Sequence, residues 1–394
     1  CQIFPVLSDD HLRRRLSHTV EVMQLASTIS SNFRLDRDLT EAGAFAHDVG
    51  HAPFGHSGEF ALDTALNQIH EELGGFNHYE HGVDVVTWLE DVYSSPGAGG
   101  LRGLNLTDET VECIFKHMHH RAGHDRSQRA LAERSKHEEL RKDSTCHLEG
   151  QAIRVADKIS YLVSDLEDGL RMGVFDLDDL RRCRFFHQPP IDLTPDRRES
   201  ALERFISQRR AILKVIMEDV MEATDGRLWS IGGSRQIRES EHYFVDYSDR
   251  LKPQMNEIWT SLIKRKLHND PRVRAANLQA TRVVGRLLLL YALCPELVDD
   301  RFSRSHGELC NTRYMRHYIG AVGDELKVGA ELTAPLSSFL TERSLAARIN
   351  RARDGTCTIR TQDVILAKDY VASLSDTRAV KEFERHLGAG DALQ

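Results

Sequence analysis

The chain has 394 residues, of which 40% are hydrophobic and 28% are charged, and its formal net charge is −8. This composition is typical of a soluble globular protein, and no apolar run approaches the roughly 20 residues that a membrane-spanning helix needs. The negative charge disfavours a general nucleic-acid-binding surface. Single-stranded nucleic acid stays open as a partner, but the net charge does not support it. We therefore expect any anionic ligand to meet a local cluster of basic residues.

The cysteines are scattered along the chain, and the sequence contains no Cys-x-x-Cys pair. Their odd number, seven, and the length of the chain argue against a secreted disulfide scaffold, so a cytoplasmic protein is expected. The sequence opens at Cys1 without a methionine, and we expect the natural N-terminus to lie upstream, so a targeting segment stays an open alternative.

Helical periodicity runs through the chain, and no convincing set of alternating strands joined by tight turns is found, so the sequence predicts an all-α fold. A first helix is expected from about Ser8 to Asn32. A second is expected from about Asp38 into residues 47–48, before a Gly-Pro-containing segment that disfavours continuation. The buried stripe of the first helix is expected to consist of Leu12, Leu16, Val20, Met23 and Ala26.

Breaks in the helical pattern are expected where Ser, Pro and Gly gather, at residues 94–103, 188–190 and 232–234. None of them is long enough for a flexible tether between domains. The highly charged segment 121–142 is interpreted as a solvated helix, with a mobile excursion as the alternative. The apolar run 287–293 is interpreted as a core segment.

Two imidazoles and two carboxylates form the most informative pattern, namely His18, the adjacent pair His47-Asp48, and Asp157. Mixed nitrogen and oxygen donors suit Mn, Fe, Ni, Co, Zn or Mg, and the set lacks the thiolates of a structural zinc site. Each residue alone is common, so the predicted divalent metal site rests on the joint pattern. Because such an ion can polarise a phosphoryl oxygen and lower the pKa of water, hydrolysis is the expected chemistry.

Further titratable groups follow the His-Asp pair closely. His51, His56 and Glu59 are candidates for proton transfer, and a helix that begins near Gly55 would place His56 and Glu59 on one face. The alternative is that the two histidines only cap turns. His78 has a weaker claim, because it can be a surface residue.

The segment from Glu149 to Leu170 is expected to form a long amphipathic helix. Within it Asp157, Tyr161 and Asp165 recur every four residues and so share one face. One edge of this helix therefore presents two carboxylates and a phenol.

Basic residues flank the expected metal ligands. Arg15 lies about one helical turn before His18, and Lys158 directly follows Asp157. Arginine offers a two-pronged donor and lysine a point charge, so the two together suit a polyphosphate chain. Solvated surface charge is the alternative for either residue alone.

Four stretches of the chain, residues 15–22, 47–59, 156–168 and 368–376, resemble one family. They are similar to the HD-domain deoxynucleoside triphosphate triphosphohydrolases, in particular the bacterial dGTPase-like enzymes and, more distantly, a vertebrate dNTPase with a sterile-alpha-motif domain. The resemblance covers nearly the whole chain. Generic HD proteins share only the four metal-ligand positions, so the surrounding motifs select this family.

The resemblance implies that water attacks the α-phosphorus of a dNTP, dGTP among them, to give a deoxynucleoside and tripolyphosphate. It implies metal ligands His18, His47, Asp48 and Asp157. The catalytic pair would be His56 and Glu59, with His51 as a further catalytic group that contacts phosphate or transfers a proton. Arg15 and Lys158 would contact the phosphates, and Tyr161 and Asp165 the sugar. Tyr161 would exclude a 2′-hydroxyl, and Asp165 would accept a hydrogen bond from the 3′-hydroxyl.

The implied fold is an all-α HD-domain fold with additional C-terminal helices. Residues 1–180 would form the metal-dependent phosphohydrolase core, and residues 181–394 a helical part packed on it in one continuous domain. A divalent ion such as Mn or Mg is the expected cofactor. A homo-oligomer and a nucleotide effector are expected partners, and no membrane is expected.

The chain departs from the family's pattern at three places. His51 stands where some bacterial relatives carry Asn, the run that begins at His78 differs from the usual motif, and the family's segment upstream of Gln2 is absent. Two other functions stay open. One is an HD phosphohydrolase for another phosphorylated nucleotide, and the other is a non-catalytic nucleotide sensor or nucleic-acid-binding scaffold.

Overall fold

The computed structural model describes residues 15–90, 102–116, 146–194, 198–231, 233, 236–237, 240, 242–329 and 356–388. Helices make up almost all of the regular structure in these ranges, which confirms the predicted all-α class. Several expectations lie outside the described residues, namely the start of the first helix at Ser8, most of the break at 94–103, part of the break at 232–234, and the charged segment 121–142.

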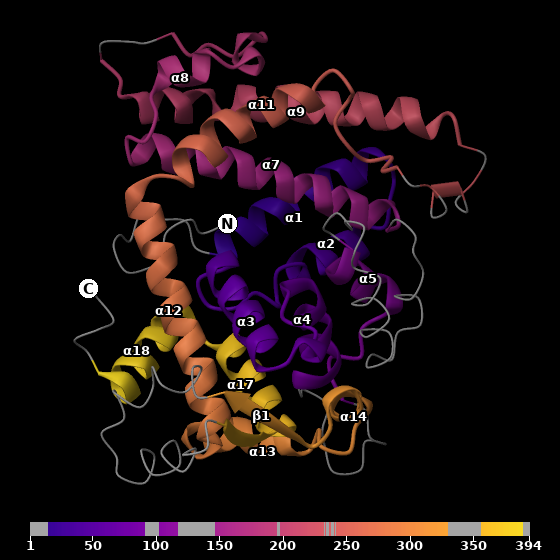
Figure 1. Cartoon of the computed structure of the whole chain (residues 1–394). Coiled ribbons are helices and arrows are strands. Elements are labelled where there is room, and N and C mark those ends of the chain that lie inside the picture. Colours follow the sequence, from indigo (N-terminus) through magenta and orange to yellow (C-terminus); the bar gives the residue numbers. More distant parts are fainter. Residues whose placement is uncertain are drawn as a thin grey trace.

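The helices that precede residue 172 form the centre of the molecule, with the long helix α7 running across it (Figure 1). Their bounds are α1 (Arg15–Asn32), α2 (Arg37–Ala46), α3 (His56–Ile69), η1 (Glu71–Leu73), α4 (His78–Asp84), η2 (Val85–Leu89), α5 (Asp108–Lys116) and α7 (Leu148–Arg171).

In the view of Figure 1 the elements after residue 172 lie above this centre, at its left and below it. Their bounds are α8 (Leu177–Arg181), η4 (Arg184–His187), α9 (Ala201–Leu228), α11 (Lys252–Ile258), η5 (Trp259–Leu267), α12 (Pro271–Leu293), η6 (Pro295–Leu297), α13 (Asp300–Gly307), α14 (Arg313–Val322), β1 (Glu325–Gly329), β2 (Thr356–Arg360), α17 (Thr361–Ser373) and α18 (Asp376–Leu387).

Two large hydrophobic clusters hold these elements together. One surrounds α7, α9 and η5, and the other joins α3 to α12 and α17. The predicted core segment 287–293 lies in α12, where Leu287, Leu288 and Leu290 are buried as expected. Both clusters contain residues from before and after position 180. The division of the chain at that position stays a prediction.

The buried face of α1 differs from the expected stripe. Ala26 is buried as expected and Val20 and Met23 are half-buried, but Leu16 is 69% exposed, while His18 and Val22 are buried. The expectation is wrong at Leu16 because the helix rests on α7 through a face that begins with a polar residue: the His18 ring lies against Ser160 of α7. Hydrophobicity alone cannot identify a helix face whose first buried position is a histidine.

A short two-stranded antiparallel sheet was not expected from the sequence. β1 pairs with β2, with Glu325 opposite Arg360 and Leu326 opposite Ile359. Leu326 and Val328 are buried while Lys327 between them is exposed, which is the alternation of a half-buried strand. Five residues are too short a run to separate this alternation from helical patterning.

Among the described residues, no helix has both the length and the apolar character that crossing a membrane requires.

Candidate active site

The turn that leaves α2 positions the His-Asp pair. Asp36 caps the start of α2, and His47 stands at its C-terminal end. Gly50 then packs so closely on α4 that a Cβ there would lie 2.0 Å from the carbonyl oxygen of His78. Phe54 and Gly55 have positive φ angles of 64° and 60°, and this reversal starts α3 at the next residue.

A distant residue holds this reversal in place. The carboxylate of Asp376, at the first position of α18, accepts a hydrogen bond of 2.8 Å from the backbone amide of Phe54. Because non-glycine residues rarely adopt positive φ, such a contact stabilises a conformation that Phe54 would otherwise avoid.

The four predicted metal ligands lie together. Oδ1 of Asp157 is 3.0 Å from Nε2 of His18 and 3.8 Å from Nε2 of His47. Oδ2 of Asp48 is 3.7 Å from Nε2 of His18 and 3.4 Å from Nε2 of His47. In an octahedral site with bonds of about 2.1 Å, neighbouring ligand atoms are about 3.0 Å apart. The observed distances are close to that spacing, so the donor set fits a divalent ion.

Hydrogen bonds on the far side of each imidazole leave Nε2 to face the other donors. His47 donates through Nδ1 to the carbonyl oxygen of Ala44 at 2.7 Å. His18 donates through Nδ1 to Oγ of Ser160 at 3.1 Å, and this hydroxyl donates to Glu21 at 2.7 Å. Arg209 pairs with Glu21. Such outer contacts fix the tautomer and orientation of metal-binding histidines.

The electrostatics of these residues favour positive charge between them. Burial opposes protonation of His47, but the carboxylates of Asp48 and Asp157 outweigh burial and raise its pKa to about 9. Burial also opposes ionisation of Asp157, yet hydrogen bonds from His18 and His47 hold its pKa far below the usual value. A bound metal cation would balance the negative charge of the same two carboxylates.

Three histidines surround the carboxylate of Glu59. Nδ1 of His56 lies 3.1 Å and Nδ1 of His78 3.0 Å from Oε2 of Glu59, and the His51 ring stacks on the His78 ring at 3.9 Å. The helix expected near Gly55 does begin there, so His56 and Glu59 share the first turn of α3. His78, whose role the sequence left open, is buried at the centre of this group.

The protonation states within this group differ. Burial opposes ionisation of Glu59, but hydrogen bonds from His56 and His78 hold its pKa far below the usual value. The hydrogen bond to Glu59 raises the pKa of His56, whereas burial lowers the pKa of His78 to about 4. At neutral pH an ionised Glu59 therefore lies between a neutral His78 and a His56 that readily holds a proton.

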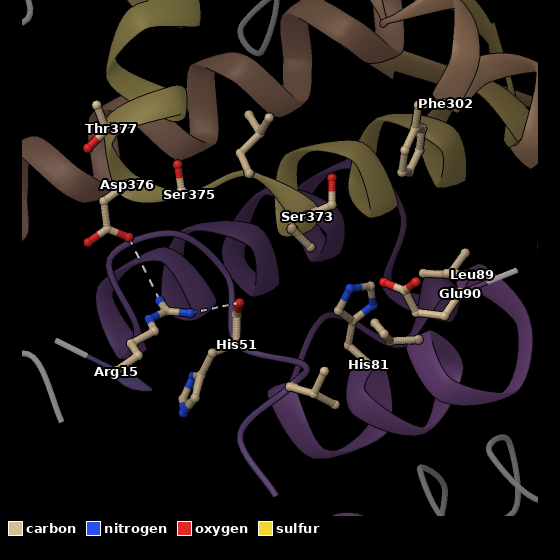
Figure 2. A pocket seen from close by; sticks show the side chains of 14 residues that line it. Arg15, His51, His81, Leu89, Glu90, Phe302, Ser373, Ser375, Asp376 and Thr377 are labelled. Carbon is tan, nitrogen blue, oxygen red and sulfur yellow. Dashed lines mark hydrogen bonds and ion pairs between the residues drawn. The ribbon is translucent and has the colours of Figure 1, made fainter. Parts of the chain in front are cut away.

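Arg15 joins three parts of the chain. Its guanidinium donates to the carbonyl oxygens of His51 at 3.2 Å and Ala52 at 2.5 Å, and Nη2 lies 3.9 Å from Oδ1 of Asp376. Figure 2 shows Arg15 between His51 and Asp376 at the side of a cavity of about 470 Å³. Arg15 also lines a second cavity of about 220 Å³, which reaches His18 and Asp48. Its expected contact with phosphate stays a prediction.

The three predicted substrate residues of α7 lie in different surroundings. Tyr161 lines the 220 Å³ cavity and packs on the ring of Trp259, with centroids 5.2 Å apart. Asp165 is fully buried, its two oxygens form no hydrogen bond with the described residues, and burial raises its pKa well above the usual value. Lys158 forms no ion pair within the described ranges, and burial together with Arg154 lowers its pKa to about 8.

The 220 Å³ cavity also contains residues that the sequence did not suggest. His268, Val273 and Asn277 line it together with Tyr161; His268 directly follows η5, and the other two belong to α12. Burial lowers the pKa of His268. These positions lie about a hundred residues beyond the motifs, in a segment whose pattern indicates only a helix start, so no local signal could have marked them.

Comparisons with known proteins agree with this arrangement. Residues 15–162 match the family model for the HD domain. The deoxyguanosinetriphosphate triphosphohydrolase-like protein of Ruegeria sp. (strain TM1040) is 32% identical over 339 residues, covering 82% of this chain and 84% of that protein. The protein of the same name from Rickettsia prowazekii (strain Madrid E) is 30% identical over 339 residues, covering 83% and 84%.

The fold and the match over residues 15–162 thus define an HD-domain protein. The chain belongs to the family of deoxyguanosinetriphosphate triphosphohydrolase-like proteins, and this membership supports a phosphohydrolase.

Proposed function

We propose that the protein hydrolyses deoxynucleoside triphosphates, dGTP among them, to a deoxynucleoside and tripolyphosphate. One observation carries the proposal: the carboxylate of Asp48 belongs to both groups of the site. Its Oδ2 faces the histidines of the four-donor centre, and its Oδ1 lies 3.4 Å from Nε2 of His51, in the group around Glu59. A phosphate held at the first group therefore lies beside proton-transfer residues of the second.

The residues His18, His47, Asp48 and Asp157 hold a divalent ion, with Mn or Mg as the leading candidates. When bound, such an ion supplies Lewis-acid polarisation of a phosphoryl oxygen and a lowered pKa for water. The contacts of His18 with Ser160 and of His47 with Ala44 keep the ligating nitrogens oriented.

His56 and Glu59 form the proton-transfer pair. Because Glu59 raises the pKa of His56, the imidazolium can donate a proton to the 5′-oxygen of the departing deoxynucleoside. His78 orients Glu59 from the other side, and His51 lies between Asp48 and this pair. A proton donor at the leaving oxygen speeds the cleavage of a phosphate ester bond.

The remaining predicted residues select the substrate. Arg15 and Lys158 contact the phosphates, as their charge suggests. Tyr161 and Asp165 receive the deoxyribose: the buried Asp165 carboxylate accepts a hydrogen bond from the 3′-hydroxyl, and the Tyr161 ring, fixed by Trp259, leaves no room for a 2′-hydroxyl. The burial of Asp165 supports this assignment, because within the described residues its oxygens have no hydrogen bond of good geometry, and a buried polar group without a partner is costly unless a ligand satisfies it.

Product analysis tests the proposal. The full chain is incubated with each dNTP and each ribonucleotide, in Mg or Mn, and the products are separated by ion-exchange chromatography. Tripolyphosphate and deoxynucleoside in equal amounts are expected. Orthophosphate or pyrophosphate instead would indicate another HD phosphohydrolase, and binding of nucleotides without turnover in any mixture would indicate a sensor. Assays that combine two nucleotides test for the expected effector. Measurement of the molecular mass in solution tests for the expected homo-oligomer.

A further inference from the structure

A second group of metal-binding side chains lies at the start of α7, apart from the centre described above. Cys113 of α5, Cys146 and His147 bring two sulfurs and a ring nitrogen within 4.8 Å of one another. Both cysteines are buried. His147 caps the N-terminus of α7, and along that helix it is ten residues before Asp157, a separation of about 15 Å.

Two glycines make room for the sulfur atoms. A Cβ on Gly150 would lie 2.1 Å from Sγ of Cys146 and 3.5 Å from Sγ of Cys113. A Cβ on Gly43 of α2 would lie 2.9 Å from Sγ of Cys113. Any larger residue at either position would push a sulfur out of place, so the backbone of two helices is fitted around the pair.

The geometry matches that of zinc ligands. Zinc–sulfur bonds of about 2.3 Å and zinc–nitrogen bonds of about 2.0–2.1 Å at tetrahedral angles place a sulfur and a nitrogen ligand about 3.6 Å apart. Sγ of Cys113 lies 3.6 Å from Nε2 of His147. Nε2 also lies 3.1 Å from the carbonyl oxygen of Glu109, a contact that zinc binding would replace, and the other ring nitrogen, Nδ1, lies 3.0 Å from the carboxylate of Glu149. A carboxylate behind a histidine is the usual outer partner of a zinc-binding imidazole.

We propose that Cys113, Cys146 and His147 bind a zinc ion that ties α5 to the start of α7. Three protein ligands leave one tetrahedral position for water. Two thiolates balance the charge of the zinc ion, which allows the ion to be buried. Since α5 also packs on α2, the ion fixes the relation between the helices that carry His47 and Asp157.

Cobalt substitution tests the proposal on the full chain. Metal-free, reduced protein is titrated with Co²⁺, and sulfur-to-cobalt charge-transfer absorption is recorded in the near ultraviolet. Only a thiolate site gives this absorption, because the four-donor centre offers nitrogen and oxygen alone. We expect one equivalent of this species in the wild type and in Asp157→Ala, and its displacement by Zn²⁺ in both.

Variants identify the ligands. Cys113→Ser and Cys146→Ser are expected to lose the charge-transfer absorption, and Glu149→Gln to weaken cobalt affinity about tenfold while leaving the band shape unchanged. Cys310→Ser, a partly exposed cysteine elsewhere, is the matched control and keeps the absorption. Circular dichroism checks that each variant is folded.

Three results would overturn the proposal, and the first needs no variant. They are a wild-type titration without sulfur charge transfer, absorption that persists in Cys146→Ser, and a Cys113–Cys146 disulfide found by peptide mapping of freshly purified protein. The last result would make the pair a redox site.

Discussion

His78 binds Glu59 twice: its ring nitrogen Nδ1 lies 3.0 Å from one carboxylate oxygen, and its backbone amide donates to the other at 3.2 Å. The carboxylate therefore cannot rotate freely between the histidines around it. Burial keeps the pKa of His78 at about 4, so at neutral pH the ring is a neutral donor. We infer that His78 positions Glu59.

The variant His78→Ala is expected to lower kcat about tenfold, the lower end of the range for loss of an orienting partner. KM should change little, because His78 does not face the cavity that Tyr161 lines. His242→Ala, at an exposed histidine, is the control. Steady-state kinetics with dGTP measure the effect, and an unchanged kcat would remove His78 from the mechanism.

Loss of Glu59 should change the pH dependence of turnover. Glu59 raises the pKa of His56, and activity that needs protonated His56 is present below this pKa and falls as the pH rises through it. In Glu59→Gln the pKa of His56 drops, so the alkaline limb of the kcat profile should move to lower pH, with kcat itself lower by about 10²–10⁴-fold.

The metal content of Glu59→Gln should stay at the wild-type value, since Glu59 is not among the four donors. An alkaline limb at the same pH in both proteins would contradict the role of His56 as a proton donor.

Metal affinity should depend on a residue that contacts no metal. Ser160 accepts a hydrogen bond from His18 and donates one to Glu21. Ser160→Ala should weaken binding of Mn²⁺ about 10–100-fold, because His18 loses the partner that fixes its tautomer. Ser164→Ala, the same change one turn further along α7, is the matched control. Equilibrium dialysis gives the affinities for Mn²⁺. Equal values for both variants would show that the Ser160 hydroxyl does not contribute to metal affinity.

Substrate analogues can isolate the expected contact of Asp165 with the sugar. Asp165→Asn should reduce kcat/KM for dGTP about tenfold, as expected for the loss of one hydrogen bond to the 3′-hydroxyl. With 2′,3′-dideoxyguanosine triphosphate, which has no 3′-hydroxyl, wild type and variant should differ little. An equal loss on both substrates would mean that the variant damages the fold rather than the sugar contact.

The Tyr161 ring should govern discrimination against ribose. Tyr161→Ala removes the side chain that packs on Trp259 and should raise turnover of GTP relative to dGTP. Tyr161→Phe keeps the ring and should keep the discrimination. Competition between the two nucleotides measures the ratio, and a ratio unchanged in Tyr161→Ala would place the selective residue elsewhere.

Local patterns in the sequence were enough to predict the helices that carry the site. The helix expected from Glu149 to Leu170 is observed as Leu148–Arg171, and the second helix ends at the His-Asp pair as expected. The spacing of three residues along one helix also predicted that His56 lies beside Glu59, as observed. These features depend on neighbours within one or two turns.

Contacts between distant segments could not be predicted in this way. The pairing of His78 with Glu59, the carbonyl contacts of Arg15 and the presence of His268 in the cavity all depend on how helices pack. The exposed Leu16 shows the same limit, since a polar residue occupies the buried position that hydrophobicity would assign to a leucine.

The contact between Asp376 and Phe54 joins residues 322 positions apart in the chain. The His-Asp motif and its helices are therefore not a transferable module, because the last helix supports the turn on which His56 begins. A shortened version of this protein for crystallography or inhibitor screening has to retain α18. Substitutions at Asp376 would act on the proposed active site through the turn at Phe54.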